Sequence, residues 1–234
     1  MPFIRKYKEM YKKKVITTDF SFGLPSSFKA SDHLKGPLAQ REDDANYIVS
    51  TILRRQAMGA SHGEDDFVTL NAATLNIIVS KDDAKKILEA LETGGVIDVD
   101  HHYVVGKYSK GYRVNHQFER DKTVQVKPTN SRFIRALERE RQRPWKARQN
   151  DHVDSKTSDL CQQMERQYHR IEINPDHAYE LIRKLPTESN PFDRQTIIVR
   201  DLISKQFEVY PTRWGRFYNS ISGLHSKVRP ALQF

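Results

Sequence analysis

Beyond a polar N-terminal segment, apolar positions recur every three or four residues, which is the period of a helix with one buried face. Asp43–Ala57 carries such a face, and its acidic first turn and basic last turn suit the helix dipole. A second helix is predicted over Asn71–Val79, where the asparagine is a good N-cap. Ser80, with Asp83 three residues later, resembles a capping box and predicts a third helix over Lys81–Thr93.

After two glycines that end the third helix, the apolar period changes from about four to two. This alternation predicts strands over Val96–Val99, Tyr103–Lys107 and Tyr112–Asn115, joined by polar turns. Three helices followed by a small antiparallel ribbon are the element order of a winged helix, a variant of the helix-turn-helix. We therefore expect a winged-helix domain over residues 41–118.

The flanking segments predict an α+β protein that is mostly α. Residues 1–40 mix basic clusters with Pro, Gly and Ser and are interpreted as an N-terminal arm, with an ordered strand around Val15–Phe22 as the alternative. Residues 119–150 are expected to form a basic linker and helix, and residues 151–234 a helical C-terminal region. Helices are predicted there over Ser131–Arg143, Asp154–Tyr168, Pro175–Leu185 and Asp193–Gln206.

The composition limits the cellular setting of the chain. The 234 residues are 37% hydrophobic, the mean hydropathy is −0.73, and no apolar run approaches the roughly 18 residues that span a bilayer. The basic N-terminus lacks the apolar stretch of a secretory signal. A single cysteine, Cys161, leaves no disulfide framework and no cysteine-rich zinc site. We expect a cytoplasmic protein with no membrane association.

The positive charge is clustered rather than spread. The formal net charge is +9, and between Lys122 and Arg148 nine lysines and arginines stand against only Glu138 and Glu140. Such a cluster favours a polyanion partner, because each cation set against a phosphate releases condensed counterions. The expected partner is DNA, single-stranded or duplex.

The third helix would be the recognition helix of a winged-helix protein. Lys81 and Lys85 are its candidate DNA contacts, but four acidic residues offset them: Asp82, Asp83, Glu89 and Glu92. The helix has no Arg, Asn or Gln for bidentate base contacts. If it contacts DNA, we therefore expect it to contact mostly phosphates. A solvated helix face of mixed charge remains equally open.

The wing segment favours nucleic-acid contact more clearly. It offers Lys107, Lys110 and Arg113 to phosphates and Tyr108 to a sugar or base, without any acidic residue between them. Because side chains alternate along a strand, Tyr112 is equally compatible with a place in the core.

The arginine-rich helix is the third candidate surface. Its arginines outnumber its two glutamates, which favours a surface that follows phosphates over a helix braced by its own ion pairs. The candidate residues there are Arg132, Arg135, Arg139 and Arg143. Three further candidates lie in the aromatic and basic C-terminal stretch, at Arg213, Arg216 and Arg229.

Patterns that indicate catalysis or cofactors are missing from the sequence. Neither glycine-rich loop of nucleotide-binding sites occurs. The pair His101 and His102 falls in an expected turn, where polar residues belong. Cys161 lies on a predicted helix with Leu160 and Met164, which favours a place in the core over a role as nucleophile. We expect no catalytic site, no cofactor and no metal.

Two short motifs carry a resemblance to a known family. The first is Gly106-Lys107-x-Ser109-Lys110-Gly111-Tyr112-Arg113 in the wing, and the second is Gly215-Arg216-x-Tyr218 followed by Leu224, Arg229 and Leu232. Together they resemble the N-terminal region of replication proteins from phages, plasmids and other mobile elements of bacteria. In that family a winged-helix-like module precedes a region related to family A DNA polymerases.

The resemblance implies a DNA-binding module that acts in replication, with a polymerase or helicase as a partner. The sequence ends at Phe234, where the family's catalytic region would begin, so no catalysis is carried over and a longer or split parent protein is expected. Two alternatives remain open. One is a winged-helix transcriptional regulator, and the other is a winged-helix module that contacts other proteins.

Overall fold

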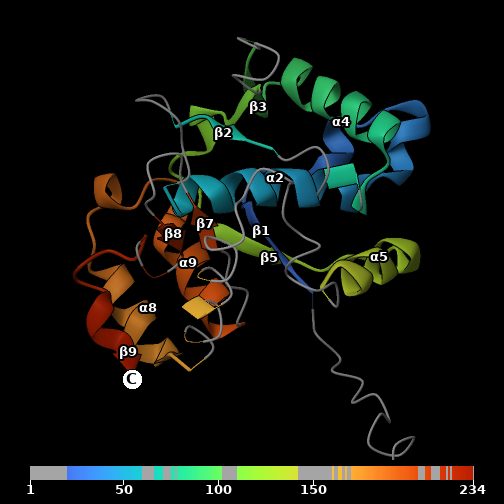
Figure 1. Cartoon of the computed structure of the whole chain (residues 1–234). Coiled ribbons are helices and arrows are strands. Elements are labelled where there is room, and N and C mark those ends of the chain that lie inside the picture. The colour runs from blue at the N-terminus through green and yellow to red at the C-terminus, as the bar shows by residue number, and fades with distance from the viewer. Residues whose placement is uncertain are drawn as a thin grey trace, which may run out of the picture.

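The computed structural model is an α+β arrangement that is mostly helical (Figure 1). It describes residues 20–59, 66–70, 75–76, 78–101, 110–141, 160, 163–164, 167, 170–204, 209–211, 217–219, 221 and 223–233. Its described α-helices are α2 (Glu42–Ala57), α4 (Lys81–Thr93), α5 (Ser131–Arg141), α8 (Pro175–Arg183) and α9 (Arg194–Ile203).

The described strands are short and pair only in antiparallel fashion. They are β1 (Phe22–Pro25), β2 (Val68–Thr69), β3 (Ile97–Asp100), β4 (Gly111–Val114), β5 (Thr123–Val126), β6 (Glu172–Ile173), β7 (Val209–Pro211), β8 (Phe217–Asn219) and β9 (Leu232–Gln233). Single turns of 3₁₀-helix lie at Ala30–Asp32, Gly36–Gln40, His116–Phe118, Thr187–Ser189, Pro191–Asp193 and Arg229–Ala231.

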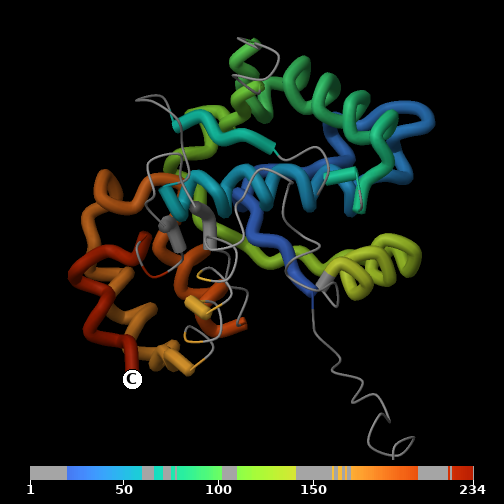
Figure 2. The backbone as a smooth tube through the Cα atoms, in the orientation of Figure 1, coloured from blue at the N-terminus to red at the C-terminus, as the bar shows by residue number. Residues whose placement is uncertain are grey.

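Helix α2 passes through the middle of the molecule (Figure 2). It packs against α4, α9, β1 and β4, so apolar side chains meet it from several directions. The apolar face that the sequence predicts for this helix is fully buried, and Ala45 beside it is buried as well. Because its neighbours come from both ends of the sequence, α2 joins α4, β2, β3 and β4 with the C-terminal region in one core.

The three-stranded sheet beside α2 has the strand order β2-β4-β3. β3 pairs directly with β4, from Ile97 opposite Val114 to Asp100 opposite Gly111. The expected return strand Tyr103–Lys107 lies outside the described residues. The third strand, β2, was not predicted, because two residues are too few to show an alternating pattern.

Residues 20–40 belong to the folded core rather than to a loose arm. β1 pairs with β5, and Phe22, Leu24, Phe28 and Leu34 are buried. Phe22 meets the rings of Tyr47 and Phe133 edge-on, at centroid distances of 6.1 and 5.8 Å. Aromatic contacts of this kind add to the stability gained from burial alone. The part of the predicted arm before residue 20 lies outside the described residues.

The segment predicted as a basic linker is also folded. It supplies β5 and α5, and the inner face of α5 is buried at Phe133, Ala136 and Leu137. The predicted helices Pro175–Leu185 and Asp193–Gln206 are confirmed as α8 and α9, each slightly shorter than expected. Most of the predicted helix Asp154–Tyr168 lies outside the described residues. No helix in the described part of the chain has both the length and the apolar character needed to cross a bilayer.

Candidate nucleic-acid interface

The exposed face of α5 carries a row of arginines. Arg132, Arg135 and Arg139 are all exposed, while Phe133 and Leu137 on the opposite face are buried. Residues three and four apart share one side of a helix, so the three side chains start from the same side of α5. We call these three residues the α5 arginine row.

The α5 arginine row has no acidic partner in the described part of the chain. The Nε atoms of Arg135 and Arg139 donate to the backbone oxygens of Ser131 and Arg135, both at 3.2 Å. Neither these two side chains nor that of Arg132 forms an ion pair with a carboxylate among the described residues. Their charge is therefore available to an external anion.

The exposed face of helix α4 carries both basic and acidic residues. Lys81 and Lys85 are exposed as predicted, but Lys85 lies 3.9 Å from the carboxylate of Glu89. Asp82 and Glu89 are exposed on the same helix. Exposed pairs of this kind contribute little energy, but the acidic residues still reduce the attraction of α4 for a polyanion.

In the described part of the predicted wing, the side chain of Arg113 contacts other residues of the protein. Its Nε donates to Oδ2 of Asp98 at 2.9 Å, and its guanidinium lies over the ring of Phe67, 4.6 Å from the centroid. Arg113 and Asp98 are directly opposite in the β3–β4 register, where opposite charges attract. Arg113 is therefore engaged within the sheet, and its contact with a phosphate stays a prediction. Tyr112 packs against the core, the alternative left open for it.

The remaining candidates are scattered. Lys110 is exposed at the start of β4, and Arg229 is exposed with its Nε donating to the backbone oxygen of Leu224 at 3.1 Å. The other candidates lie outside the described residues, namely Lys107, Tyr108, Arg143, Arg213 and Arg216. His101 lies 2.8 Å from Glu92, and no group of three or more potential metal ligands occurs among the described residues.

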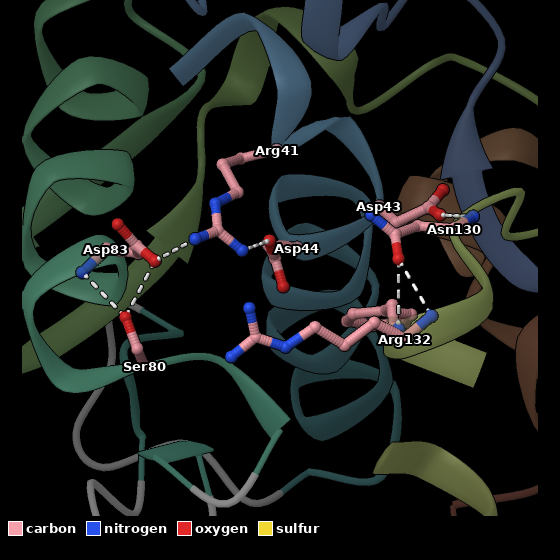
Figure 3. A network of polar contacts seen from close by, with 8 residues as sticks. Arg41, Asp43, Asp44, Ser80, Asp83, Asn130 and Arg132 are labelled. Carbon is pink, nitrogen blue, oxygen red and sulfur yellow. Dashed lines mark hydrogen bonds and ion pairs between the residues drawn. The ribbon is translucent and has the colours of Figure 1, made fainter. Parts of the chain in front are cut away.

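The acidic start of α2 fixes the position of α5. Asp43 is buried, and its Oδ2 accepts hydrogen bonds from the backbone N–H of Thr129 at 2.8 Å and from that of Asn130 at 2.6 Å. Figure 3 shows Asp43 beside Asn130. Asn130 in turn caps α5, because its Oδ1 accepts from the N–H groups of Arg132 and Phe133. From the sequence alone, Asp43 was related only to the dipole of its own helix. Nothing in the sequence indicated its hydrogen bonds to the residues before α5.

The same end of α2 fixes the position of α4. Arg41 lies between Asp44 of α2 and Asp83 of α4, with nitrogen–oxygen distances of 3.5 and 2.6 Å (Figure 3). Ser80 caps α4 as predicted, accepting from the N–H of Asp83 at 3.3 Å and donating to its Oδ2 at 2.7 Å. Helices α4 and α5 are thus both attached to the start of α2.

Asp44 is the acidic residue of this network that burial affects most. Burial raises its pKa to about 6, the charge of Arg41 lowers it, and the nearby carboxylates of Asp83 and Asp43 raise it. An acid with a raised pKa in the folded state keeps a proton that the unfolded chain has already lost.

No protein-family model matches the sequence, and neither a curated protein nor a solved structure is significantly similar to it.

We predict that Asp43→Ala destabilises the protein by about 2–4 kcal/mol, because two backbone donors at the entry to α5 lose a buried, charged acceptor. Urea unfolding followed by circular dichroism measures the effect. Glu42→Ala is the matched control, since Glu42 precedes Asp43 and is exposed; its effect should stay within about 0.5 kcal/mol. Equal effects of the two variants would show that the hydrogen bonds of Asp43 do not secure α5.

We also predict that Asp44 makes the protein less stable as the pH rises from about 4 to 7. In that range the folded state binds a proton at Asp44 that the unfolded state does not, so the free energy of unfolding falls with pH. Asp44→Asn should flatten this part of the profile, and the exposed control Asp82→Asn should leave it unchanged. Unfolding in urea at several pH values tests this, and an unchanged profile in Asp44→Asn would contradict it.

Proposed function

We propose that this protein binds the phosphate backbone of DNA through the α5 arginine row, beside a winged-helix core. The observation that carries the proposal is the exposed row of three arginines without acidic partners, on a helix anchored to the core by Asp43 and Phe133. A guanidinium binds phosphate through two parallel hydrogen bonds, which suits it to backbone contact.

The order of the elements supports the winged-helix assignment. α2 is followed by β2, by helical residues at Leu75, Asn76 and Ile78, and then by α4, β3 and β4. The central place of β4 between β2 and β3 agrees with a sheet in which the first strand joins the ribbon of the wing.

The α5 arginine row fits the backbone of a nucleic acid in its dimensions. Arg132 and Arg139 are seven residues apart, which corresponds to about 10 Å along a helix axis. One strand of B-DNA rises about 3.4 Å per nucleotide, so the row extends over about three nucleotides. Contacts to phosphates carry no direct sequence information, so the proposed binding tolerates different sequences.

Binding to the phosphate backbone without sequence preference fits a role in replication best. A transcriptional regulator requires base contacts, and α4 offers no Arg, Asn or Gln to make them. The resemblance of the wing motif to replication proteins of phages and plasmids points to the same setting. We therefore propose a non-catalytic DNA-binding module of a mobile element, working with a polymerase or helicase.

The proposal predicts that Arg132→Gln, Arg135→Gln and Arg139→Gln combined weaken DNA binding about tenfold or more. Three exposed ion pairs of about 0.5 kcal/mol each account for that factor. Fluorescence anisotropy with two duplexes of unrelated sequence should give similar losses for both. Glutamine keeps the helix propensity of arginine, so circular dichroism should show an unchanged fold.

The matched control is Lys81→Gln combined with Lys85→Gln on α4, which should weaken binding much less. If the α4 variant loses more affinity than the α5 variant, or if the loss depends on the DNA sequence, docking occurs through the recognition helix. That outcome would favour the transcriptional regulator and reject the proposed role of α5.

A further inference from the structure

A cavity of about 300 Å³ lies between the end of α2 and the start of α9. The side chains that α2 and α9 contribute to its wall are largely buried, whereas two other lining residues, Gly59 and Ser189, are exposed. The cavity is therefore open to solvent on one side. Small-molecule sites in proteins are clefts of this kind, and this one lies at the lower end of their size range.

Gln56 of α2 contributes an unused hydrogen-bond donor to the cavity wall. Its side chain is 1% exposed, and its Oε1 accepts from the N–H of Val114 at 3.2 Å. Because a backbone N–H needs an acceptor, this bond fixes which end of the amide faces β4. The Nε2 at the other end is buried and has no hydrogen-bond partner in the described part of the chain. A buried donor of this kind costs free energy until an acceptor reaches it.

Arg194 of α9 contributes a second unused donor. Its Nη2 pairs with the carboxylate of Asp66, and its guanidinium lies over the ring of Phe192, 5.8 Å from the centroid. Its Nε, however, is buried without a partner among the described residues. Since Asp66 already compensates the positive charge, Arg194 offers the cavity a hydrogen-bond donor rather than a net charge. This favours an uncharged ligand over a phosphate.

The backbone around Arg194 is strained. Within the described ranges, the non-glycine residues with a positive φ are Asp66, Phe192 and Asp193, at 58°, 53° and 51°. Asp66 is the ion-pair partner of Arg194, Phe192 supplies the ring beneath its guanidinium, and Asp193 precedes it in the sequence. Left-handed backbone is unfavourable for side chains of this size, and such strain concentrates at ligand-binding and catalytic sites. All three strained residues thus adjoin one residue of the cavity wall.

The two donors and the rest of the wall define the chemistry of a ligand. The acceptor of Gln56 is occupied and a guanidinium has none, so the ligand must bring acceptor atoms. Ala57, Met58 and Pro191 add apolar surface. A small, uncharged, partly apolar molecule with acceptors fits this wall, and nucleobases combine these properties. Guanine presents two neighbouring acceptors, O6 and N7, whereas adenine has an amino donor beside its N7.

We propose that this cavity binds a nucleobase through its acceptor edge, with guanine preferred over adenine. Nε2 of Gln56 and Nε of Arg194 donate to the base, whose acceptors supply the partners that both atoms lack. The base belongs either to a DNA strand, as an unstacked nucleotide, or to a free nucleoside. Only the first source rests on the function proposed above.

The position of the cavity is compatible with a strand that also contacts the α5 arginine row. Asp43, which anchors α5, and Gln56 are thirteen residues apart on α2, which corresponds to about 20 Å along the helix axis. About six nucleotides of a strand with the B-form rise of about 3.4 Å cover this distance. One bound strand can therefore contact both sites.

The first test measures binding of deoxyguanosine and deoxyadenosine to the full chain by isothermal titration calorimetry. These nucleosides carry no phosphate, so the α5 arginine row does not contribute. Arg194→Lys keeps a charge opposite Asp66 but removes Nε, and should weaken deoxyguanosine binding about three- to tenfold, as expected for one lost hydrogen bond. Gln56→Met, which removes the amide at similar volume, should have an effect of the same size.

The matched control for Arg194→Lys is Arg54→Lys. Arg54 also forms a partly buried ion pair with an aspartate, but it is not among the residues that line the cavity. Its replacement should leave the affinity for both nucleosides unchanged. Circular dichroism should show that all three variants are folded.

A second measurement distinguishes the two sources of the base. It compares a single-stranded oligonucleotide of adenines with one that carries a single central guanine. A preference for the guanine strand that disappears in Arg194→Lys assigns the site to a base of DNA, whereas a preference among the nucleosides alone assigns it to a small molecule. The variant without the α5 arginine row should bind both strands more weakly and keep its affinity for deoxyguanosine, so failure of one proposal is separable from failure of the other.

Three results would overturn the proposal. The unmodified protein would distinguish guanine from adenine in neither pair of probes, or folded Arg194→Lys would keep the full preference, or Arg54→Lys would lose as much affinity. In each case the two buried donors bind only water, and the cavity is not a site for a base.

Discussion

Helix α2 is enclosed by apolar side chains along its middle, and the polar groups at its two ends are buried as well. A buried polar group without a partner costs free energy, so neighbouring segments must supply partners at both ends. Asp43 at the start accepts two backbone hydrogen bonds from the entry to α5. Gln56 near the end accepts one from the N–H of Val114 in β4, at 3.2 Å. These contacts fix the helix and the sheet around α2.

This requirement also determines where positive charge reaches the surface. Several acidic residues are engaged by internal partners, so they do not neutralise the outer helices: Asp43, Asp44, Asp83, Asp98 and Asp201. Arg41, Arg54 and Arg113 are bound by some of these carboxylates and are withdrawn from the surface with them. The α5 arginine row forms no ion pair with a carboxylate in the described part of the chain, so its positive charge is exposed on the surface.

The sequence predicted the helices well and the contacts between distant segments poorly. Period and capping residues located α2, α4, α8 and α9, because those signals are local. The β1–β5 pair went unrecognised, since each strand is only four residues long and its partner is about a hundred residues away. The pairing of Arg113 with Asp98 was not predicted for a similar reason, because it depends on the register of β3 and β4. The exposure of the α5 arginine row was predictable, since an amphipathic helix separates its faces.

Whether the α5 arginine row binds DNA phosphates is tested most sharply by the salt dependence of duplex binding, compared between the unmodified protein and the variant without the row. Between about 50 and 200 mM salt, each phosphate contact contributes about −0.9 to the slope of log affinity against log salt concentration. We expect a steep negative slope for the unmodified protein and one that is shallower by nearly three for the variant. Equal slopes for the two proteins, or binding independent of salt, would contradict it.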